Sequence, residues 1–138
     1  MTPGLVLDSS ALLAILFGEP EQNAFLDLIF DAAERRISSF SILEAGSVVL
    51  ARKGPAGRLI FDSLCEELAL EVVPFTAEHM RLARQAWERF GKGRHPAALN
   101  LGDCCSYALA RATGHPLLCK GKDFPQTDLD LVSREDLE

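Results

Sequence analysis

Four acidic residues stand at the boundaries of predicted structural elements, where their carboxylates can meet. Asp8 ends an apolar run near the N-terminus, and Asp123 follows a similar run near the C-terminus. Glu44 and Asp103 each fall in the first turn of a predicted helix. Four converging carboxylates repel one another unless cations neutralise their charge, and oxygen ligands suit hard ions such as Mg²⁺ or Mn²⁺. Such ions activate water and stabilise charge on a phosphodiester, which is the chemistry that this set of residues indicates.

Each of these acids also has a purely structural explanation. Asp8 can cap a helix, and Asp123 can be an ordinary loop residue. The segment Ser41-Ile-Leu-Glu44 fits the capping box S-x-x-E, in which the glutamate binds a backbone amide at the helix start. Asp103 lies near the N-terminus of its predicted helix, where the helix dipole stabilises any acid. Taken one at a time, the four residues leave both explanations open.

The elements that must position these acids alternate between short apolar strands and amphipathic helices. We predict strands at 5–7, 37–40, 71–75, 117–119 and 129–132, and helices at 11–17, 21–35, 41–52, 56–68, 77–90 and 101–113. Thr76 and Asn100 are expected N-caps, and Gly54-Pro55 and Gly114 are expected helix ends. This alternation predicts an α/β fold with a parallel sheet and right-handed crossovers. In such sheets the site lies beyond the carboxyl ends of the strands.

The size and composition of the chain are those of one globular domain. It has 138 residues, of which 48% are hydrophobic and 25% charged, so we expect a single domain over residues 1–138. No apolar run approaches the roughly 20 residues that a membrane-spanning helix needs. The N-terminus lacks the features of a signal peptide, and we therefore expect a cytoplasmic protein. The four cysteines include no CxxC pair, which disfavours a zinc ribbon and indicates free thiols.

The charge of the chain is unevenly distributed. The net charge is −6, but between Arg81 and Lys122 eight basic residues face only two acidic ones. That segment therefore carries +6 and the rest of the chain −12. A basic segment on an acidic protein can attract phosphates locally. Solvated helix faces are the alternative explanation for some of these cations.

The motifs around the four acids resemble those of the PIN-domain family, and specifically the VapC-type ribonuclease toxins of prokaryotic toxin–antitoxin pairs. The matching segments are 6–12 (VLDSSAL), 41–44 (SILE), 91–110 (GKGRHPAALNLGDCCSYALA), 116–124 (PLLCKGKDF) and 127–129 (TDL). The resemblance spans nearly the whole chain, and its second half is the most specific part. Lys122, Leu101 and Cys105 depart from residue types that are common in the family, but none of these differences removes a carboxylate.

The resemblance implies a compact three-layer α/β/α sandwich with a short parallel sheet. It implies that Asp8, Glu44, Asp103 and Asp123 form an acidic quartet around Mg²⁺ or Mn²⁺, with Asp8 and Asp103 as the most direct ligands. Ser10 matches a small hydroxyl residue near the metal that holds a water or a carboxylate. The resemblance further implies a homodimer that is inhibited by a VapB-like antitoxin and that, when free, cleaves RNA and halts translation.

Within that expectation, three basic residues are candidate contacts to the RNA backbone. Lys92 and Arg94 lie in a loop that precedes the helix of Asp103, and Lys120 lies in the loop that carries Asp123. Cationic side chains beside a nuclease site can neutralise phosphates along a bound strand. The identity of the target RNA does not follow from these residues.

Other functions are less consistent with the same acids. A metal-dependent phosphatase on a related sheet usually needs a second acid two residues after the first-strand aspartate, and that position is Ser10. A phosphorylated receiver module needs an acidic pair near the N-terminus, and Asp8 has no acidic neighbour. The remaining alternative is a PIN-like domain that binds RNA or regulates without catalysis, for which a missing carboxylate would be typical.

Overall fold

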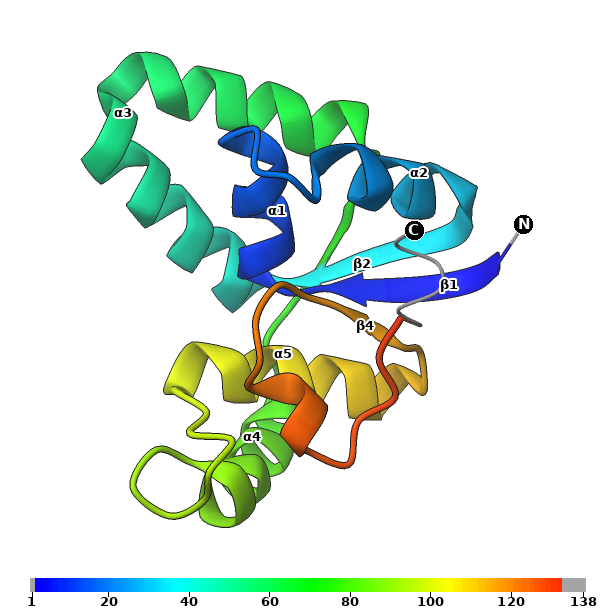
Figure 1. Ribbon diagram of the computed structural model, residues 1–138, viewed down its shortest axis with the longest axis vertical. Coiled ribbons are helices and arrows are strands. Elements are labelled where there is room, and N and C mark those ends of the chain that lie inside the picture. Colours follow the sequence, from blue (N-terminus) through cyan, green and yellow to red (C-terminus); the bar gives the residue numbers. More distant parts are fainter. Residues whose placement is uncertain (1, 133–138) are drawn as a thin grey trace.

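The computed structural model describes residues 2–132, whose helices and strands alternate along most of the chain (Figure 1). The elements are β1 (Thr2–Leu7), α1 (Ser9–Leu16), α2 (Gln22–Asp31), β2 (Ala32–Ser38), α3 (Ser39–Glu67), β3 (Glu71–Val73), α4 (Ala77–Phe90), α5 (Leu101–Thr113), β4 (Leu117–Leu118) and the 3-10 helix η1 (Phe124–Gln126). None of the helices within residues 2–132 is both long and apolar enough to cross a membrane.

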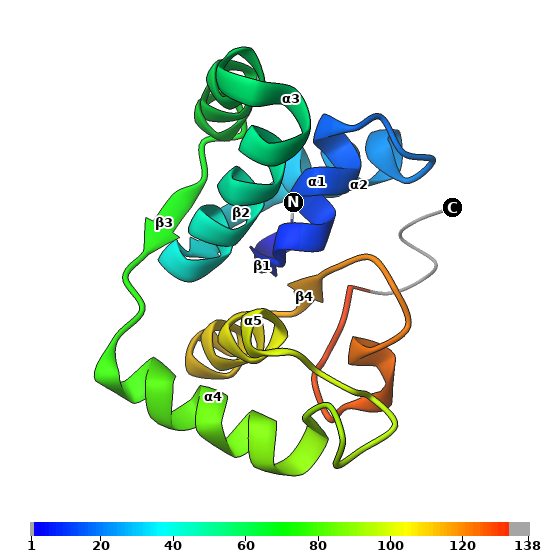
Figure 2. The same cartoon turned by 90° about the vertical axis from the view of Figure 1, so that its left-hand side faces the viewer.

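The strands form a four-stranded parallel sheet with the order β3-β2-β1-β4. Helices α1, α2 and α3 cover one face of this sheet, and α4 and α5 cover the other face (Figures 1 and 2). The predicted three-layer α/β/α sandwich with a short parallel sheet is therefore confirmed. Because β1 and β4 are neighbours and parallel, the chain segments that follow them leave the sheet at the same edge.

Strand β1 lies between two hydrophobic cores, because successive side chains of a strand point to opposite faces of a sheet. Leu5 and Leu7 are buried in the core that the sheet shares with α1, α2 and α3, whereas Val6 is buried in the core shared with α4 and α5. Strand β4 divides in the same way, with Leu118 in the first core and Leu117 in the second. Burial on both faces fixes the position of the strand end that precedes Asp8.

The predicted boundary between the helix 21–35 and the strand that follows it was wrong. The expected helix 21–35 ends at Asp31, and β2 covers residues 32–38 in place of the short strand predicted at 37–40. The apolar periodicity of α2 continues to Ala32, but from that residue onward the backbone pairs with β1, as far as the pair Leu7↔Ile37. Pairing with a strand that is distant in sequence overrides a local helix preference.

Helix α3 begins two residues earlier than predicted. It begins at Ser39 rather than at residue 41, because the Ser38 side chain caps it by accepting a hydrogen bond from the Phe40 amide at 3.2 Å. The predicted helices 41–52 and 56–68 are the two halves of α3, and the break expected at Gly54-Pro55 is confirmed. Gly54 has a φ of 66°, and the helix turns a sharp corner there (Figure 1).

Smaller differences concern the ends of the sheet. The strand predicted at 71–75 ends at Val73, and the strand predicted at 129–132 is reduced to one bridge between Leu117 and Leu131. The expected caps Thr76 and Asn100 are confirmed, and Gly114 ends α5 in the left-handed conformation with a φ of 73°.

Candidate active site

Asp8 is a buried carboxylate at the carboxyl end of β1, with only 2% of its surface exposed. One oxygen, Oδ2, accepts a hydrogen bond from the Ser10 amide at 3.0 Å and so caps α1. The other, Oδ1, accepts a hydrogen bond from the Ser106 hydroxyl of α5 at 2.5 Å. The helix therefore begins at Ser9 rather than at residue 11, and the capping explanation for Asp8 is correct. Capping and hydrogen bonding from α5 hold this carboxylate in one orientation.

Glu44 approaches the same edge of the sheet from α3. Because α3 begins at Ser39, Glu44 lies in its second turn, and the predicted capping box from Ser41 is wrong. The Glu44 carboxylate instead accepts a hydrogen bond from the Ser9 hydroxyl at 2.7 Å. It also packs against Gly102 of α5, where a Cβ atom would overlap both carboxylate oxygens. A glycine at this position is what allows Glu44 to reach the start of α5.

Asp103 lies in the first turn of α5 and forms a capping box with Asn100. The Asp103 amide donates to the Asn100 side chain at 2.8 Å, and the Asn100 amide donates to Asp103 Oδ2 at 3.0 Å. Burial raises the pKa of Asp103 to about 6 although the Asn100 amide lowers it, and the negative charges of Asp8, Asp123 and Glu44 raise it further. The three other acids are therefore close enough to act electrostatically on Asp103.

Asp123 is the exposed member of the set. It lies in the loop that follows β4, immediately before η1, and its side chain does not cap that helix. The loop is held next to Asp8 by Ser10, whose hydroxyl accepts a hydrogen bond from the Lys120 amide at 2.9 Å. Ser10 thus fixes the backbone of the loop; its implied contact with a metal-bound water or a carboxylate stays a prediction.

The oxygen donors fit a hard divalent cation, although they do not form a finished ligand cage. No group of three or more His, Cys, Asp or Glu side chains among residues 2–132 is arranged to hold an ion as it stands. Mg²⁺, however, usually keeps several waters and binds through only one or two carboxylates. Asp8 is buried, and its charge contributes to the raised pKa of Asp103. A bound cation would stabilise the ionised forms of both carboxylates. Bound water could link such a cation to the more distant carboxylates.

The basic residues of the segment 81–122 fall into two groups. Lys92 and Arg94 are exposed on the loop that links α4 to α5. Lys120, in contrast, forms ion pairs with Glu19 at 2.5 Å and with Glu21 at 3.3 Å. Its ammonium group is therefore already bound to two carboxylates, which weakens the prediction that Lys120 contacts RNA.

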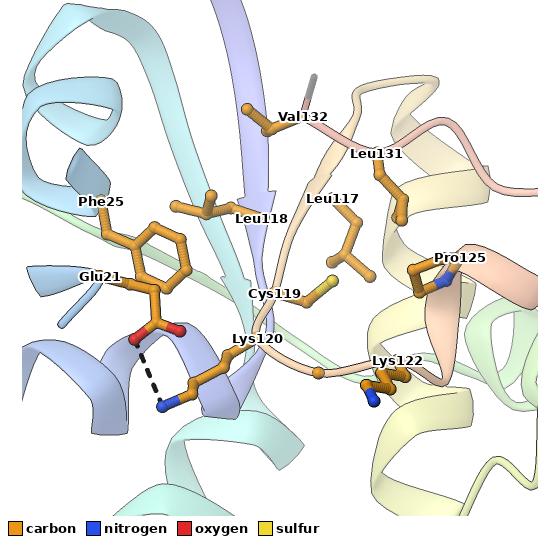
Figure 3. Close-up of a pocket in the computed structure, with 11 residues that line it drawn as sticks. Glu21, Phe25, Leu117, Leu118, Cys119, Lys120, Lys122, Pro125, Leu131 and Val132 are labelled. Carbon is orange, nitrogen blue, oxygen red and sulfur yellow. Dashed lines mark ion pairs between the residues drawn. The ribbon is translucent and has the colours of Figure 1, made fainter. Parts of the chain in front are cut away.

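A pocket of about 660 Å³ is lined in part by the loop residues Cys119, Lys120 and Lys122 (Figure 3). Its walls are largely apolar, with Phe25 and Leu118 on one side and Pro125 and Leu131 on the other. The four acids do not line this pocket. We therefore place the candidate chemistry at the carboxyl edge of β1 and not in this pocket.

Known proteins share both the sequence pattern and the fold. The family model of the PIN domain matches residues 5–129. Ribonuclease VapC36 of Mycobacterium tuberculosis is 43% identical over 127 residues, which cover 91% of each chain. The crystal structure of Mycobacterium tuberculosis VapC20, described as a sarcin–ricin loop cleaving toxin, matches with a TM-score of 0.75 at 16% identity and covers 93% of this chain and 98% of that one. A toxin–antitoxin complex from Klebsiella pneumoniae matches with a TM-score of 0.69 at 15% identity, over 90% and 92% of the two chains. The chain therefore belongs to the PIN-domain family and, within it, to the VapC ribonucleases.

Proposed function

We propose that this protein is a metal-dependent endoribonuclease and the toxin of a toxin–antitoxin pair. The observation that carries the proposal is the buried Asp8 carboxylate at the end of β1, held there by Ser10 and Ser106. The pKa of Asp103 supports it, because burial raises that pKa to about 6 and the charges of Asp8, Asp123 and Glu44 raise it further. Ribonucleases of this family generally depend on divalent metal ions. We infer that Asp8, Glu44, Asp103 and Asp123 hold Mg²⁺ or Mn²⁺ at this edge of the sheet.

When bound, such an ion would activate water and stabilise negative charge on the phosphodiester. The protein supplies a fixed arrangement of acids around it. The Ser10 amide and the Ser106 hydroxyl orient Asp8, and the Ser9 hydroxyl orients Glu44. Carboxylates that are already held in place can take up a cation with little reorganisation.

RNA binding is proposed for Lys92 and Arg94, for which no ion pair is found within the described part of the chain. Lys92 and Arg94 are exposed on the loop 91–99, whose ends are joined by a bridge between Gly91 and Leu99. His95 stiffens this loop, because its Nδ1 accepts a hydrogen bond from the Ala97 amide at 3.0 Å. A rigid loop with two exposed cations beside the start of α5 suits the backbone of a single-stranded RNA. We propose Lys92 and Arg94 as RNA contacts, and Lys120 chiefly as a loop anchor.

The proposed partners are a VapB-like antitoxin and a second copy of the chain, with action on cytoplasmic RNA. The antitoxin is supported by the match to the Klebsiella pneumoniae toxin–antitoxin complex. Large apolar side chains also remain exposed on α3, among them Leu43, Leu59 and Ile60. Apolar side chains on a surface helix indicate contact with another protein chain when they form a patch.

The decisive experiment is cleavage of total cellular RNA by purified protein that is free of antitoxin. Wild type and Asp8→Asn are compared with Mg²⁺, with Mn²⁺ and with a chelator, and Asp62→Asn serves as the matched control. Asn is a good N-cap, so Asp8→Asn should keep α1 and a native circular dichroism spectrum. Asp62 is exposed on α3 and pairs only loosely with Arg58, at 3.8 Å.

We expect discrete fragments from wild type and Asp62→Asn, and none from Asp8→Asn or in the chelator. Mapping the fragment ends would identify the target RNA. Retained cleavage by a folded Asp8→Asn variant would refute the role of the acids. Folded wild type that binds RNA but cleaves none with either ion would favour the alternative, a PIN-like domain that binds without catalysis.

A further inference from the structure

The loop that carries Asp123 follows β4 and runs from Cys119 to Asp128. Asp123 itself is exposed, and its side chain does not cap η1. The same loop contains Gly121, whose φ of 116° lies outside the range of ordinary residues. The position of Asp123 must therefore come from contacts elsewhere in the loop.

One end of the loop is attached to the α1–α2 side of the sheet. The Lys120 amide donates to the Ser10 hydroxyl at 2.9 Å. The Lys120 ammonium group pairs with Glu19 and Glu21, and Figure 3 shows the pair with Glu21. These contacts fix the loop just before Gly121 but leave the residues after it to be held by other contacts.

The other end is attached to α4 and α5 through Asp128. Its Oδ1 accepts a hydrogen bond from the Tyr107 hydroxyl at 2.7 Å. Its Oδ2 accepts hydrogen bonds from Arg111 at 2.9 Å and from Arg89 at 3.1 Å. One carboxylate thus binds three donors on two helices, and bonds to charged donors are the stronger ones.

The spacing of Tyr107 and Arg111 along α5 relates the contacts of Asp128 to the candidate active site. Asp103, Tyr107 and Arg111 are four residues apart in succession, and residues at that spacing lie in one row on a helix, about 6 Å apart along its axis. Asp103 is the first residue of the row, and Asp123 precedes Asp128 by five residues in the loop. Asp128, at the end of the same loop, binds the other two.

We propose that Asp128 is a positioning residue for the metal site: by binding Tyr107, Arg111 and Arg89 it sets the register of the loop along α5 and so the approach of Asp123 to Asp103. The inference rests on the proposed function, because it assigns Asp123 a role in holding the ion. Asp128 itself is not expected to contact the ion or the RNA. It acts only through the loop.

The test compares Asp128→Asn with wild type and with the matched control Asp62→Asn. The first readout is hydrogen exchange at the amides of Gln126 and Thr127, which donate to the carbonyls of Asp123 and Phe124 at 3.2 and 2.9 Å. The second readout is the affinity for Mn²⁺ alone, measured by calorimetry. The third is the rate of RNA cleavage as a function of Mg²⁺ concentration.

We expect faster exchange of both loop amides in Asp128→Asn and a loss of Mn²⁺ affinity of roughly tenfold, the size seen when a residue that orients a ligand is removed. Raised Mg²⁺ should restore much of the cleavage. In the background of Asp123→Asn, the Asp128 change should cost no further Mn²⁺ affinity, because its effect passes through Asp123. A merely structural residue would give additive losses and no rescue by Mg²⁺.

Loop exchange and Mn²⁺ affinity within twofold of wild type would overturn the proposal, as would fully additive losses in the double variant. If Asp128→Asn does not fold, Tyr107→Phe removes a single donor and answers the same question. If wild type neither binds Mn²⁺ nor cleaves RNA, the proposed function fails. In that case, unchanged hydrogen exchange in Asp128→Asn would also overturn the role of Asp128 in holding the loop. Faster exchange would support that role.

Discussion

Asp103→Asn removes one of the four acidic charges while keeping the shape of the side chain. The pKa of Asp103 rises from an ordinary value of 3.8 to about 6, first because of burial and then because of the neighbouring acids. That value already includes the favourable hydrogen bond from the Asn100 amide. A rise of this size corresponds to about 3 kcal/mol, at about 1.4 kcal/mol per pH unit. Asp103 is partly exposed, so solvent screening reduces the figure to about 1 kcal/mol.

The sign follows from proton binding. Between about pH 4 and pH 6 the folded protein binds a proton at Asp103 that the unfolded chain has already lost, so stability falls as the pH rises through this window. Above pH 6 the full penalty of the ionised carboxylate is present. Metal-free Asp103→Asn should therefore be more stable than wild type at pH 7.5, by about 1 kcal/mol or about 3 °C in Tm for a domain of this size. The advantage should shrink towards zero at pH 4.

The assay is thermal unfolding in a chelator at pH 7.5 and pH 4.5, repeated with Mn²⁺. Mn²⁺ should stabilise wild type by mass action but Asp103→Asn much less, because one ligand charge is gone. RNA cleavage should be lost in the variant at both pH values. A variant that is less stable than wild type at pH 7.5, or whose advantage is the same at pH 4.5, would refute the claim that the ionised Asp103 carboxylate destabilises the metal-free protein.

Two further changes test the geometry around the acids. Gly102→Ala should displace the Glu44 carboxylate, since a Cβ there would overlap it, and lower the cleavage rate by about a hundredfold. Gly46→Ala is the control, because a Cβ at that position meets its nearest neighbour at an ordinary 3.6 Å. Replacing Lys92 and Arg94 together by Gln should weaken RNA binding and reduce the slope of log affinity against log salt by about 1.4, at about 0.7 per phosphate contact. An unchanged salt slope would exclude both residues from the RNA path.

The sequence by itself determined the local features of the protein. Strand ends at Asp8, N-caps at Thr76 and Asn100, and helix breaks at Gly54 and Gly114 depend on side chains within a few residues of one another. Their signals are therefore written in short segments. The alternation of strands and helices was enough to predict the parallel sheet and the edge where the carboxylates lie.

Long-range pairing decided what local signals could not. The start of β2 depends on β1, which gives the backbone from Ala32 onward its hydrogen-bond partners. The role of Glu44 depends on the Ser9 hydroxyl and on the space at Gly102, neither of which is near it in sequence. A capping-box pattern in the sequence carries no information about those contacts.

The same limit applies to the charged residues. Lys120 looked like a cation available to RNA, but the fold places Glu19 and Glu21 beside its ammonium group. Asp128 lies between the predicted strands 117–119 and 129–132, and the fold brings three donors from α4 and α5 to its carboxylate. The sequence determined which charges the protein has, and only the tertiary structure decided which of them neutralise one another. The reason is that electrostatic partners are set by distance in space and not by separation along the chain.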